Sequence, residues 1–495
     1  MKRARIFILL LVVLAMVATA CDSDDSDDTT TTAAEGETTT TAAAEEETTT
    51  TAAEETTTSV AAAAGTIDFW STEKEPARVV EQQAIVDRFT AETGIDVNLV
   101  IVPQDAIPST MLVNAASGTL PDVVFHALDL TIGWAEAGIL DLDAANEVID
   151  NLGRETFSEG ALALASVDGV PSAVPSDGWG QLLIYRTDLF DAAGLEVPDT
   201  FDKITAAAEA LNDPGNNFFG ITMSNDPNGS FTQQTFEHMA LANGCNLVDD
   251  SGAVTLDTPQ CVEAIDFYAN LQNNYAPAGL QDVVNTRATY FAGQAGMIVW
   301  SPFIMDEMAG LRDEATPTCP ECADDVAYLA KNSDFVSSFS GPSGAPAQYG
   351  QTQYMGIGMT DDTELSKQFV EYWLSEAYLD WLSVSVEGKF PLRRGTSEDP
   401  TLYIEGWKQL QTGVDREAPL SDFYAEEVIN GLIEGTNDFD RWGFIEGEGA
   451  LVGALTTTLI VPKTLDEVLA GSLSAEEAAA QMQELAEEEQ SFLEE

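Results

Sequence analysis

Residues 182–211 read LLIYRTDLFDAAGLEVPDTFDKITAAAEAL, and this stretch is punctuated like a strand followed by two helices. The apolar run from Leu182 to Tyr185 is typical of a buried strand. Gly194 is expected to end the first helix, Pro198 to form a turn, and Thr200 to cap the second helix. The apolar face of that second helix consists of Phe201, Ile204, Ala208 and Leu211.

The same alternation of strand and helix recurs on both sides of this stretch. Residues 66–70 form a short apolar run before an amphipathic segment. Over residues 95–101, apolar residues occupy every second position, as in a strand. Residues 121–125 form a further short run before an amphipathic segment that ends near Leu140. This order predicts α/β lobes with largely parallel sheets.

Later segments are predicted to be helical. Residues 369–382 carry apolar side chains at helical spacing, so we expect one amphipathic helix whose tryptophans, Trp373 and Trp381, lie in the core. Capping-box patterns beginning at Thr464 and Ser474 predict short helices near the C-terminus.

The stretch from Leu182 resembles the Tyr-Asn-Lys-Asp-Leu-Phe, Ala-Gly and Pro-x-Thr-Trp run of extracellular solute-binding proteins of the maltose-binding type. Arg186 and Phe201 depart from the usual Asn and Trp. The cysteine-bearing stretch 317–325 has no counterpart in that pattern. Further matching landmarks are residues 118–125, 134–140, 291–300, 388–393 and 468–478.

The resemblance implies a type II periplasmic-binding-protein fold, in which two α/β lobes are joined by crossing hinge strands and the ligand lies between them. By resemblance the first lobe takes residues 65–177 and 327–382, and the second takes residues 178–326 and 383–495. A chain of 495 residues suits two lobes, because single cores stop growing near ~250–300 residues.

The N-terminus predicts an exported lipoprotein. A basic start and an apolar run of residues 6–17 indicate a signal peptide over residues 1–20. Cys21 follows Ala-Thr-Ala, which resembles a lipobox whose cysteine is acylated, for example with palmitate. Residues 21–64 are rich in Thr, Ala and Glu and predict a disordered acidic tether; threonine glycosylation is left open. We therefore expect anchoring to the outer face of the cell membrane, or a periplasmic location, through lipidated Cys21 alone.

Charge excludes one class of partner. Lys and Arg total 20 against 84 Asp and Glu, which gives a formal net charge of −64. Such a surface repels nucleic-acid phosphates, so we expect no nucleic-acid binding. The acidity leaves open whether the protein works in a saline habitat.

Candidate ligand-binding side chains follow the ends of predicted strands, where ligands meet open α/β sheets. Three tryptophans at separate strand ends, each beside a polar residue, suit a sugar, whose C–H face packs on aromatic rings while its hydroxyls bond carboxylates and amides. By resemblance, Asp129 matches a carboxylate on sugar hydroxyls and His126 an aromatic position. The predicted ligand-binding residues are Trp70, Glu73, His126, Asp129, Asp177, Trp179, Trp300, Ser301, Gln353 and Tyr354.

Each of these residues has a structural alternative. A tryptophan is often a packing residue, His126 could be a structural histidine at a strand end, and Asp177 could belong only to a turn.

Four cysteines follow Cys21, an even number that suits disulfides in an oxidising compartment. We expect the pairs Cys245–Cys261 and Cys319–Cys322. A zinc site using all four, or a redox centre at Cys319 and Cys322, is the alternative. We expect no metal and no cofactor.

The predicted function is capture of a small solute, most favourably a mono- or oligosaccharide, and delivery to an ABC-type permease by hinge closure of a monomer. A non-sugar solute remains an alternative: a glycerol phosphodiester, a polyol or an organic cation. We expect no enzyme, because only two histidines are present and no carboxylate pair is singled out for glycoside hydrolysis.

Overall fold

The computed structural model describes residues 65–104 and 106–493. The predicted signal peptide, the tether and Cys21 lie outside the described residues. Within the described ranges, no helix combines the length and the apolar character needed to cross a membrane.

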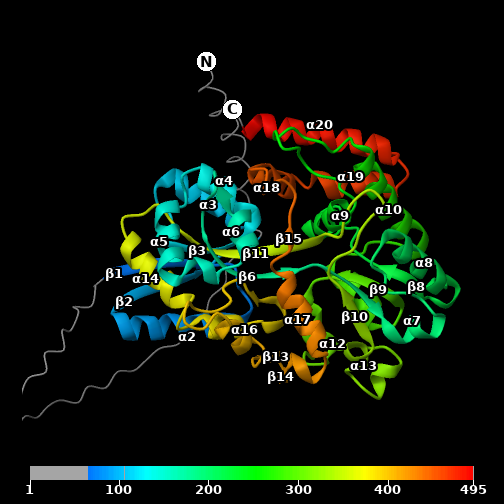
Figure 1. The fold of residues 1–495 in the computed structure, drawn as a ribbon, viewed down its shortest axis with the longest axis horizontal. Helices are drawn as coiled ribbons and strands as arrows, with labels where there is room; N and C mark the ends of the chain where they lie inside the picture. Colours follow the sequence, from blue (N-terminus) through cyan, green and yellow to red (C-terminus); the bar gives the residue numbers. More distant parts are fainter. Residues whose placement is uncertain (1–64, 105, 494–495) are drawn as a thin grey trace, which may run out of the picture. The chain divides into compact units, whose positions relative to one another are not determined.

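The larger sheet has seven strands in the order β12-β6-β11-β3-β1-β2, with β15 paired to β11 (Figure 1). β1 pairs parallel with β2 and β3, whereas β11 runs antiparallel to β3 and β6. Its strands are β1 (Gly65–Ser71), β2 (Ile95–Ile101), β3 (Val123–Ala127), β6 (Val174–Gly180), β11 (Gln348–Ile357), β12 (Phe390–Pro391) and β15 (Phe439–Asp440).

The smaller sheet has four strands in the order β10-β7-β9-β8. β7 runs antiparallel to both neighbours, and only β8 and β9 are parallel. The four strands are β7 (Leu182–Arg186), β8 (Phe219–Thr222), β9 (Ala295–Trp300) and β10 (Ser333–Val336).

The prediction of largely parallel sheets is therefore wrong. Parallel neighbours need a long crossover, usually a helix, between them. The chain instead passes from β6 of the larger sheet to β7 of the smaller sheet through the single residue Gln181, so no crossover helix intervenes. β6 and β12 run antiparallel to their neighbours, whereas β11 is antiparallel to β3 and β6 but parallel to β15. Both sheets are therefore mixed.

Helices beside the larger sheet bury an aromatic core. Phe69 of β1 meets Phe369 and Trp373, with ring centroids 5.2 and 5.0 Å apart, and Trp373 and Trp381 are fully buried as predicted. The helices are α2 (Pro76–Thr93), α3 (Ile107–Ser117), α4 (Leu128–Glu136), α5 (Leu142–Leu152), α14 (Thr363–Trp373) and α15 (Tyr378–Ser383).

The single helix predicted over residues 369–382 is wrong, because the chain makes a turn between α14 and α15. The amide of Ala377 bonds the carbonyl of Tyr372 at 3.1 Å, five residues back rather than the four of an α-helix.

Helices beside the smaller sheet include the predicted pair after β7. α7 ends at Gly194, whose φ is 68°, and the Thr200 hydroxyl accepts a hydrogen bond from the amide of Lys203. Both cap predictions are confirmed. These helices are α7 (Thr187–Ala193), α8 (Phe201–Leu211), α9 (Ser230–Ala242), α10 (Pro259–Tyr275) and α11 (Val283–Phe291).

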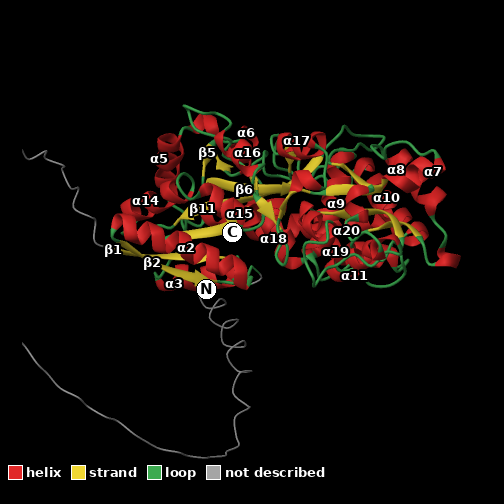
Figure 2. Cartoon of the chain, turned by 90° about the horizontal axis from the view of Figure 1, so that it is seen from below, coloured by secondary structure: helices red, strands yellow, loops and turns green. Residues whose placement is uncertain are grey.

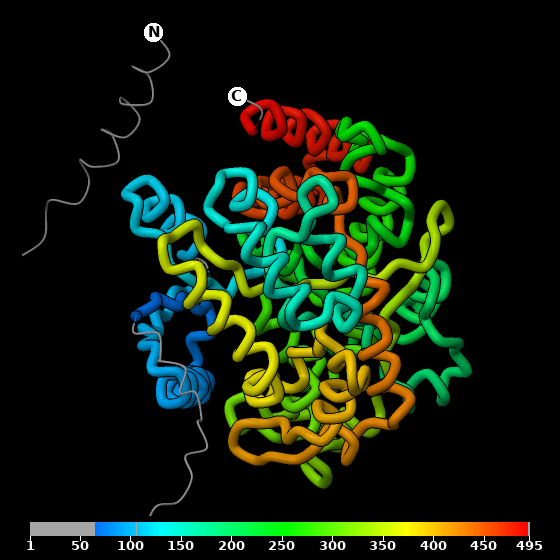
Figure 3. Tube along the Cα trace, turned by 60° about the vertical axis from the view of Figure 1, so that its left-hand side comes forward, coloured from blue at the N-terminus to red at the C-terminus, as the bar shows by residue number. Residues whose placement is uncertain are grey.

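The C-terminal helices return to this second group. α20 (Ala475–Leu493) packs along α10, and α19 (Ile460–Leu469) contacts α9 and α10 (Figure 3). Figure 2 shows α7, α8 and α10 at the end of the folded body opposite to α14, β1 and β2. The two sheets with their helices form the two lobes.

The lobe boundaries drawn by resemblance stay a prediction. Strand pairing puts β10 on the smaller sheet and β12 on the larger one, although the boundaries assign residues 327–382 to the first lobe and 383–495 to the second. The structure contains the disulfides Cys245–Cys261 and Cys319–Cys322.

Candidate functional site

Three aromatic rings form a row where the two sheets meet. Trp179 of β6 has its ring centroid 6.2 Å from Phe303 and 6.2 Å from Tyr349 of β11. Phe303 belongs to the short helix η3 (Pro302–Ile304), which directly follows β9. Trp179 and Phe303 are half-buried, whereas Tyr349 is fully buried. We call these three residues the aromatic row; it draws its rings from both lobes.

An ion network lies at the Phe303 end of the row. Glu73 pairs with Arg78 at 2.9 Å and with Lys389 at 2.8 Å, and Lys389 also pairs with Asp177 at 3.3 Å. The Arg78 guanidinium stands 5.8 Å from the centre of the Phe303 ring. We call Glu73, Arg78, Asp177 and Lys389 the Glu73 network.

Lys389 is the centre of this network and is almost fully buried. Its ammonium lies 4.0 Å from the Trp381 ring and 4.8 Å from the Phe125 ring, which adds cation–π attraction to the two ion pairs. Burial acts to raise the pKa of Glu73, but Lys389 and Arg78 outweigh it and lower that pKa to about 2. Glu73 is therefore a carboxylate at neutral pH.

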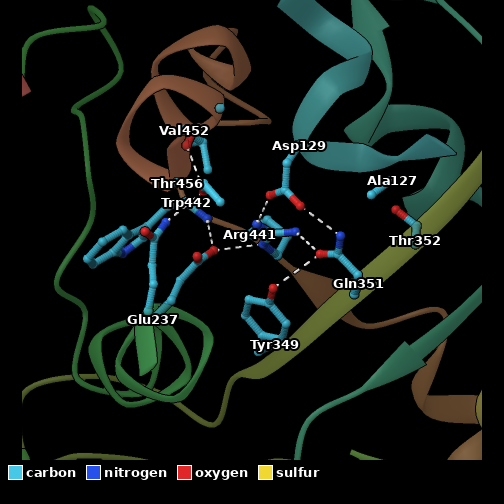
Figure 4. A network of polar contacts seen from close by, with 12 residues as sticks. Ala127, Asp129, Glu237, Tyr349, Gln351, Thr352, Arg441, Trp442, Val452 and Thr456 are labelled. Atoms are coloured by element: carbon cyan, nitrogen blue, oxygen red, sulfur yellow. Dashed lines mark hydrogen bonds and ion pairs between the residues drawn. The ribbon is translucent and has the colours of Figure 1, made fainter. Parts of the chain in front are cut away.

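A second ion network lies at the Tyr349 end (Figure 4). The Arg441 guanidinium donates to Asp129 of α4 at 2.6 Å, to Glu237 of α9 at 2.8 Å and to the Gln351 side chain at 2.6 Å. Gln351 in turn donates to Asp129 at 2.7 Å and accepts from the Tyr349 hydroxyl at 3.1 Å. We call Asp129, Glu237, Gln351 and Arg441 the Arg441 network.

Arg441 also covers the row, since its guanidinium lies 4.6 Å from the centre of the Tyr349 ring. Burial raises the pKa of Glu237 in spite of Arg441. Burial acts the same way on Asp129, but Arg441 and Gln351 outweigh it and lower the pKa of Asp129. Arg441 thus ties a helix of each lobe to the central strand β11.

The electrostatics of the site are nearly balanced. The two networks hold the carboxylates of Glu73, Asp129, Asp177 and Glu237 against Arg78, Lys389 and Arg441, and each charge has an opposite partner. Breaking one such buried pair would leave an uncompensated charge, which costs roughly 3–5 kcal/mol. A neutral guest avoids that cost.

Several predicted site residues pack in the core instead. His126 is fully buried, with its ring 5.1 Å from Trp134, and burial lowers its pKa to about 4. Tyr354 is also fully buried and donates its hydroxyl to the carbonyl of Ala161 at 2.8 Å. Trp70 is 8% exposed within the core. The structure favours the packing alternative for these three residues.

Four other predicted residues belong to the row or to the ion networks beside it. Glu73, Asp129 and Asp177 belong to the ion networks, so their side chains are already engaged, and Trp179 is the middle ring. Trp300 is 6% exposed and packs in the core, with its ring 4.9 Å from that of Phe231. Ser301, directly before η3, and Gln353, opposite Ala127 on β11, are half-buried.

Sequence reasoning missed Phe303, Arg78, Lys389 and Arg441. Phe303 follows a predicted strand end by three residues, so a wider window would have included it. The sequence signal for the basic residues was weaker. The chain has only 20 Lys and Arg residues, and those near glycines and aromatic residues, such as Lys389 after Gly388, are candidates for buried ion pairs. Their partners are distant in sequence, so spacing could not reveal them.

A pocket of about 850 Å³ adjoins the Glu73 network, with Arg78, Arg312 and Ser385 in its lining. Its acidic lining residues are Glu75, Glu81, Asp313, Glu314, Asp380, Glu387, Asp415 and Glu417. In the described part of the chain, no group of three or more His, Cys, Asp or Glu side chains is arranged to hold a metal ion.

The model of the bacterial extracellular solute-binding protein family matches residues 79–379. A model named New glue protein family matches residues 1–92, which include the Thr-rich segment. YcjN of Escherichia coli strain K12, named as an ABC transporter periplasmic-binding protein, is 27% identical over 425 residues, covering 82% of this chain and 93% of YcjN.

Solved structures are similar over most of the chain. The GacH receptor of Streptomyces glaucescens, solved unliganded and in complex with acarbose, has a TM-score of 0.64 at 21% identity, over 86% of this chain and 98% of the receptor. An ABC transporter solute binding protein of Agrobacterium vitis S4 with bound D-mannitol has a TM-score of 0.59 at 18% identity, over 87% and 99% of the two chains. Both likenesses confirm the predicted fold.

Proposed function

The chain belongs to the bacterial extracellular solute-binding protein family, and on that basis we propose that it captures an uncharged sugar or polyol and delivers it to an ABC-type permease. The aromatic row supports an uncharged ligand, because it lies between two ion networks in which every charge already has an opposite partner. Half-buried rings supply a flat apolar surface for the C–H face of a sugar, and the neighbouring polar groups can bond its hydroxyls.

The relatives support this class of ligand. GacH was solved with acarbose, and the Agrobacterium vitis protein was solved with D-mannitol. Both guests are rich in hydroxyl groups. We propose a hydroxyl-rich ligand for this chain too, because its aromatic row presents ring surface and the charges beside the row are all paired.

Capture would proceed by closure of the lobes. Trp179 lies on β6 of the larger sheet and Phe303 follows β9 of the smaller one, so a guest that packs on both rings contacts both lobes. Such a guest binds the closed state better and shifts the population toward it. Gln181, between β6 and β7, would serve as a hinge point, and Ser301 and Gln353 are proposed further contacts.

A thermal-shift panel of neutral sugars, polyols and quaternary amines tests the proposal. A ligand at ~100 times its Kd adds roughly 2.7 kcal/mol to stability, which is readily measured. We expect a sugar or polyol to raise the melting temperature. A panel in which only cations raise it would contradict the ligand class.

An organic cation is the second candidate, and the acidic pocket beside the Glu73 network favours it. Substitution of pocket carboxylates, such as Asp415→Asn with Glu417→Gln, would then abolish the shift with a quaternary amine. The same substitutions would leave a shift with a sugar unchanged.

We further propose that the protein releases its ligand unaltered. Incubation with an oligosaccharide followed by mass spectrometry should return the intact compound, whereas hydrolysis products would identify an enzyme.

Export and anchoring are proposed from the sequence alone. Cys21 would carry the lipid, and the body would act as a monomer. A Cys21→Ser variant should leave the membrane fraction for the soluble one, and unchanged membrane association would contradict acylation at Cys21.

A further inference from the structure

Helix α18 (Gly449–Thr458) lies between the two lobes. It packs against α4, which follows β3 of the larger sheet, and against α19 and α20, which belong with α9 and α10 (Figure 1). Its Thr456 hydroxyl also accepts a hydrogen bond from Gln233 of α9 at 3.0 Å. Through α18 the second lobe therefore touches the helix that carries Asp129.

Two glycines allow the close approach of α18 to α4. A Cβ at Gly453 would lie 2.6 Å from the carbonyl oxygen of Asp129, and a Cβ at Gly449 would lie 2.6 Å from the Ile132 side chain. Real Cβ atoms do not approach a backbone so closely, so any other residue at position 453 forces the helices apart. Gly133 of α4 has nothing within 4 Å of its Cβ position and makes no such contact.

This contact closes the Tyr349 end of the aromatic row. Asp129 is held under α18 and fixes Arg441, and Arg441 covers the Tyr349 ring. Tyr349 is fully buried, and the Asp129 carboxylate is occupied by Arg441 and Gln351. Only Trp179 and Phe303 keep exposed ring surface.

We propose that this arrangement limits the ligand to a single sugar ring or a linear polyol of similar size, and that α18 sets the limit. The inference rests on the proposed sugar-binding function. An oligosaccharide needs successive ring faces for successive sugar units, and in this row only Trp179 and Phe303 have exposed ring surface. A longer chain that extended past Tyr349 would have to displace Arg441, which is buried and bonded to Asp129, Glu237 and Gln351.

Titration calorimetry with a size series tests the inference on the unmodified protein. The series consists of hexoses, hexitols and the corresponding di- and trisaccharides. We expect a monosaccharide or hexitol to bind at least tenfold more tightly than any trisaccharide. A trisaccharide that binds as tightly as the best short ligand would overturn the size limit while leaving the sugar-binding function intact. Failure of every sugar and polyol would overturn the proposed function and this inference with it.

The Gly453→Ala variant tests the role of α18. Pushing α18 away from Asp129 should loosen Arg441 and reduce the preference for short ligands. This preference is measured as the ratio of the affinity for the best short ligand to the affinity for a trisaccharide. That ratio is insensitive to a simple loss of stability. Gly133→Ala is the matched control on α4 and should keep the wild-type ratio. An unchanged ratio in Gly453→Ala would overturn the assignment to α18, and the wild-type series decides the size limit even if that variant does not fold.

Discussion

Lys389 joins two carboxylates that come from different strands of the larger sheet. Glu73 follows β1, and Asp177 lies on β6, where it also accepts a hydrogen bond from the Trp381 indole at 2.8 Å. All of these groups are largely buried, so the network stabilises the fold only while every charged group keeps its partner.

We predict that Lys389→Met lowers the free energy of unfolding by roughly 3–5 kcal/mol at neutral pH, because it removes the ion-pair partner of the buried Asp177 and leaves Glu73 paired with Arg78 alone. Chemical denaturation measures this loss. Lys74→Met, at an exposed lysine in the loop that carries Glu73, is the control and should have little effect.

The pH dependence of the same pair has a definite sign. The pKa of Glu73 is lowered from 4.5 to about 2, so its contribution to stability is present above pH 4.5 and is lost as the pH falls toward 2. The Lys389→Met variant should keep only the part of this contribution that Arg78 supplies. Equal acid stability in the two proteins would contradict the pairing.

The two histidines give a direct test of burial. His126 and His238 are both fully buried, and burial lowers the pKa of each from 6.5 to about 4. Both stabilise the fold above pH 6.5, and this contribution is lost as the pH falls from 6.5 to 4. An NMR titration of the imidazole protons should show both pKa values well below 6. A pKa near 6.5 for His126 would contradict its burial and favour the ligand-binding role predicted from the sequence.

At the scale of elements, the short helix α12 (Met305–Met308) carries two buried acids directly after η3. Glu307 pairs with Arg287 and Asp306 pairs with Arg312, each at 2.5 Å. Burial nevertheless raises the pKa of Glu307 to about 7 and also raises that of Asp306. Burial, together with the nearby Glu387 carboxylate, therefore outweighs the two arginines.

The Glu307→Gln variant should be more stable than the wild type at pH 8 but not at pH 5. A raised pKa means that the contribution of Glu307 is present below pH 4.5 and is lost as the pH rises through about 7. Each pKa unit corresponds to about 1.4 kcal/mol, so the difference should reach a few kcal/mol. Urea denaturation at the two pH values measures it, with Glu426→Gln as the exposed control. A difference that does not change with pH would contradict the account.

Elements were predictable where local chemistry fixes them. The Ser474 capping box is confirmed, since Ser474 and Glu477 exchange hydrogen bonds at 2.9 and 3.2 Å. The matching pattern at Thr464 is wrong, because Thr464 lies inside α19. Both share one sequence pattern, and only tertiary packing decides which becomes a helix start.

At the scale of the whole molecule, the fold was predictable because the strand–turn–helix stretch after Leu182 is local and specific. The site was predictable only in part. Trp179 and three acids of the proposed site are among the residues that strand ends predict, but the packing of Trp70, His126 and Tyr354 depends on neighbours from other elements. Arg441 joins Asp129 across more than three hundred positions, which sequence spacing cannot show.

The central claim is that the aromatic row holds a neutral solute, and titration calorimetry of the Trp179→Ala variant tests it most directly. The wild type should bind its best sugar or polyol one-to-one, and Trp179→Ala should bind it at least roughly tenfold more weakly, since a tenfold change is about 1.4 kcal/mol. Phe423→Ala, at a half-buried aromatic outside the row, should retain wild-type affinity. Equal affinity in the wild type and Trp179→Ala would contradict the account.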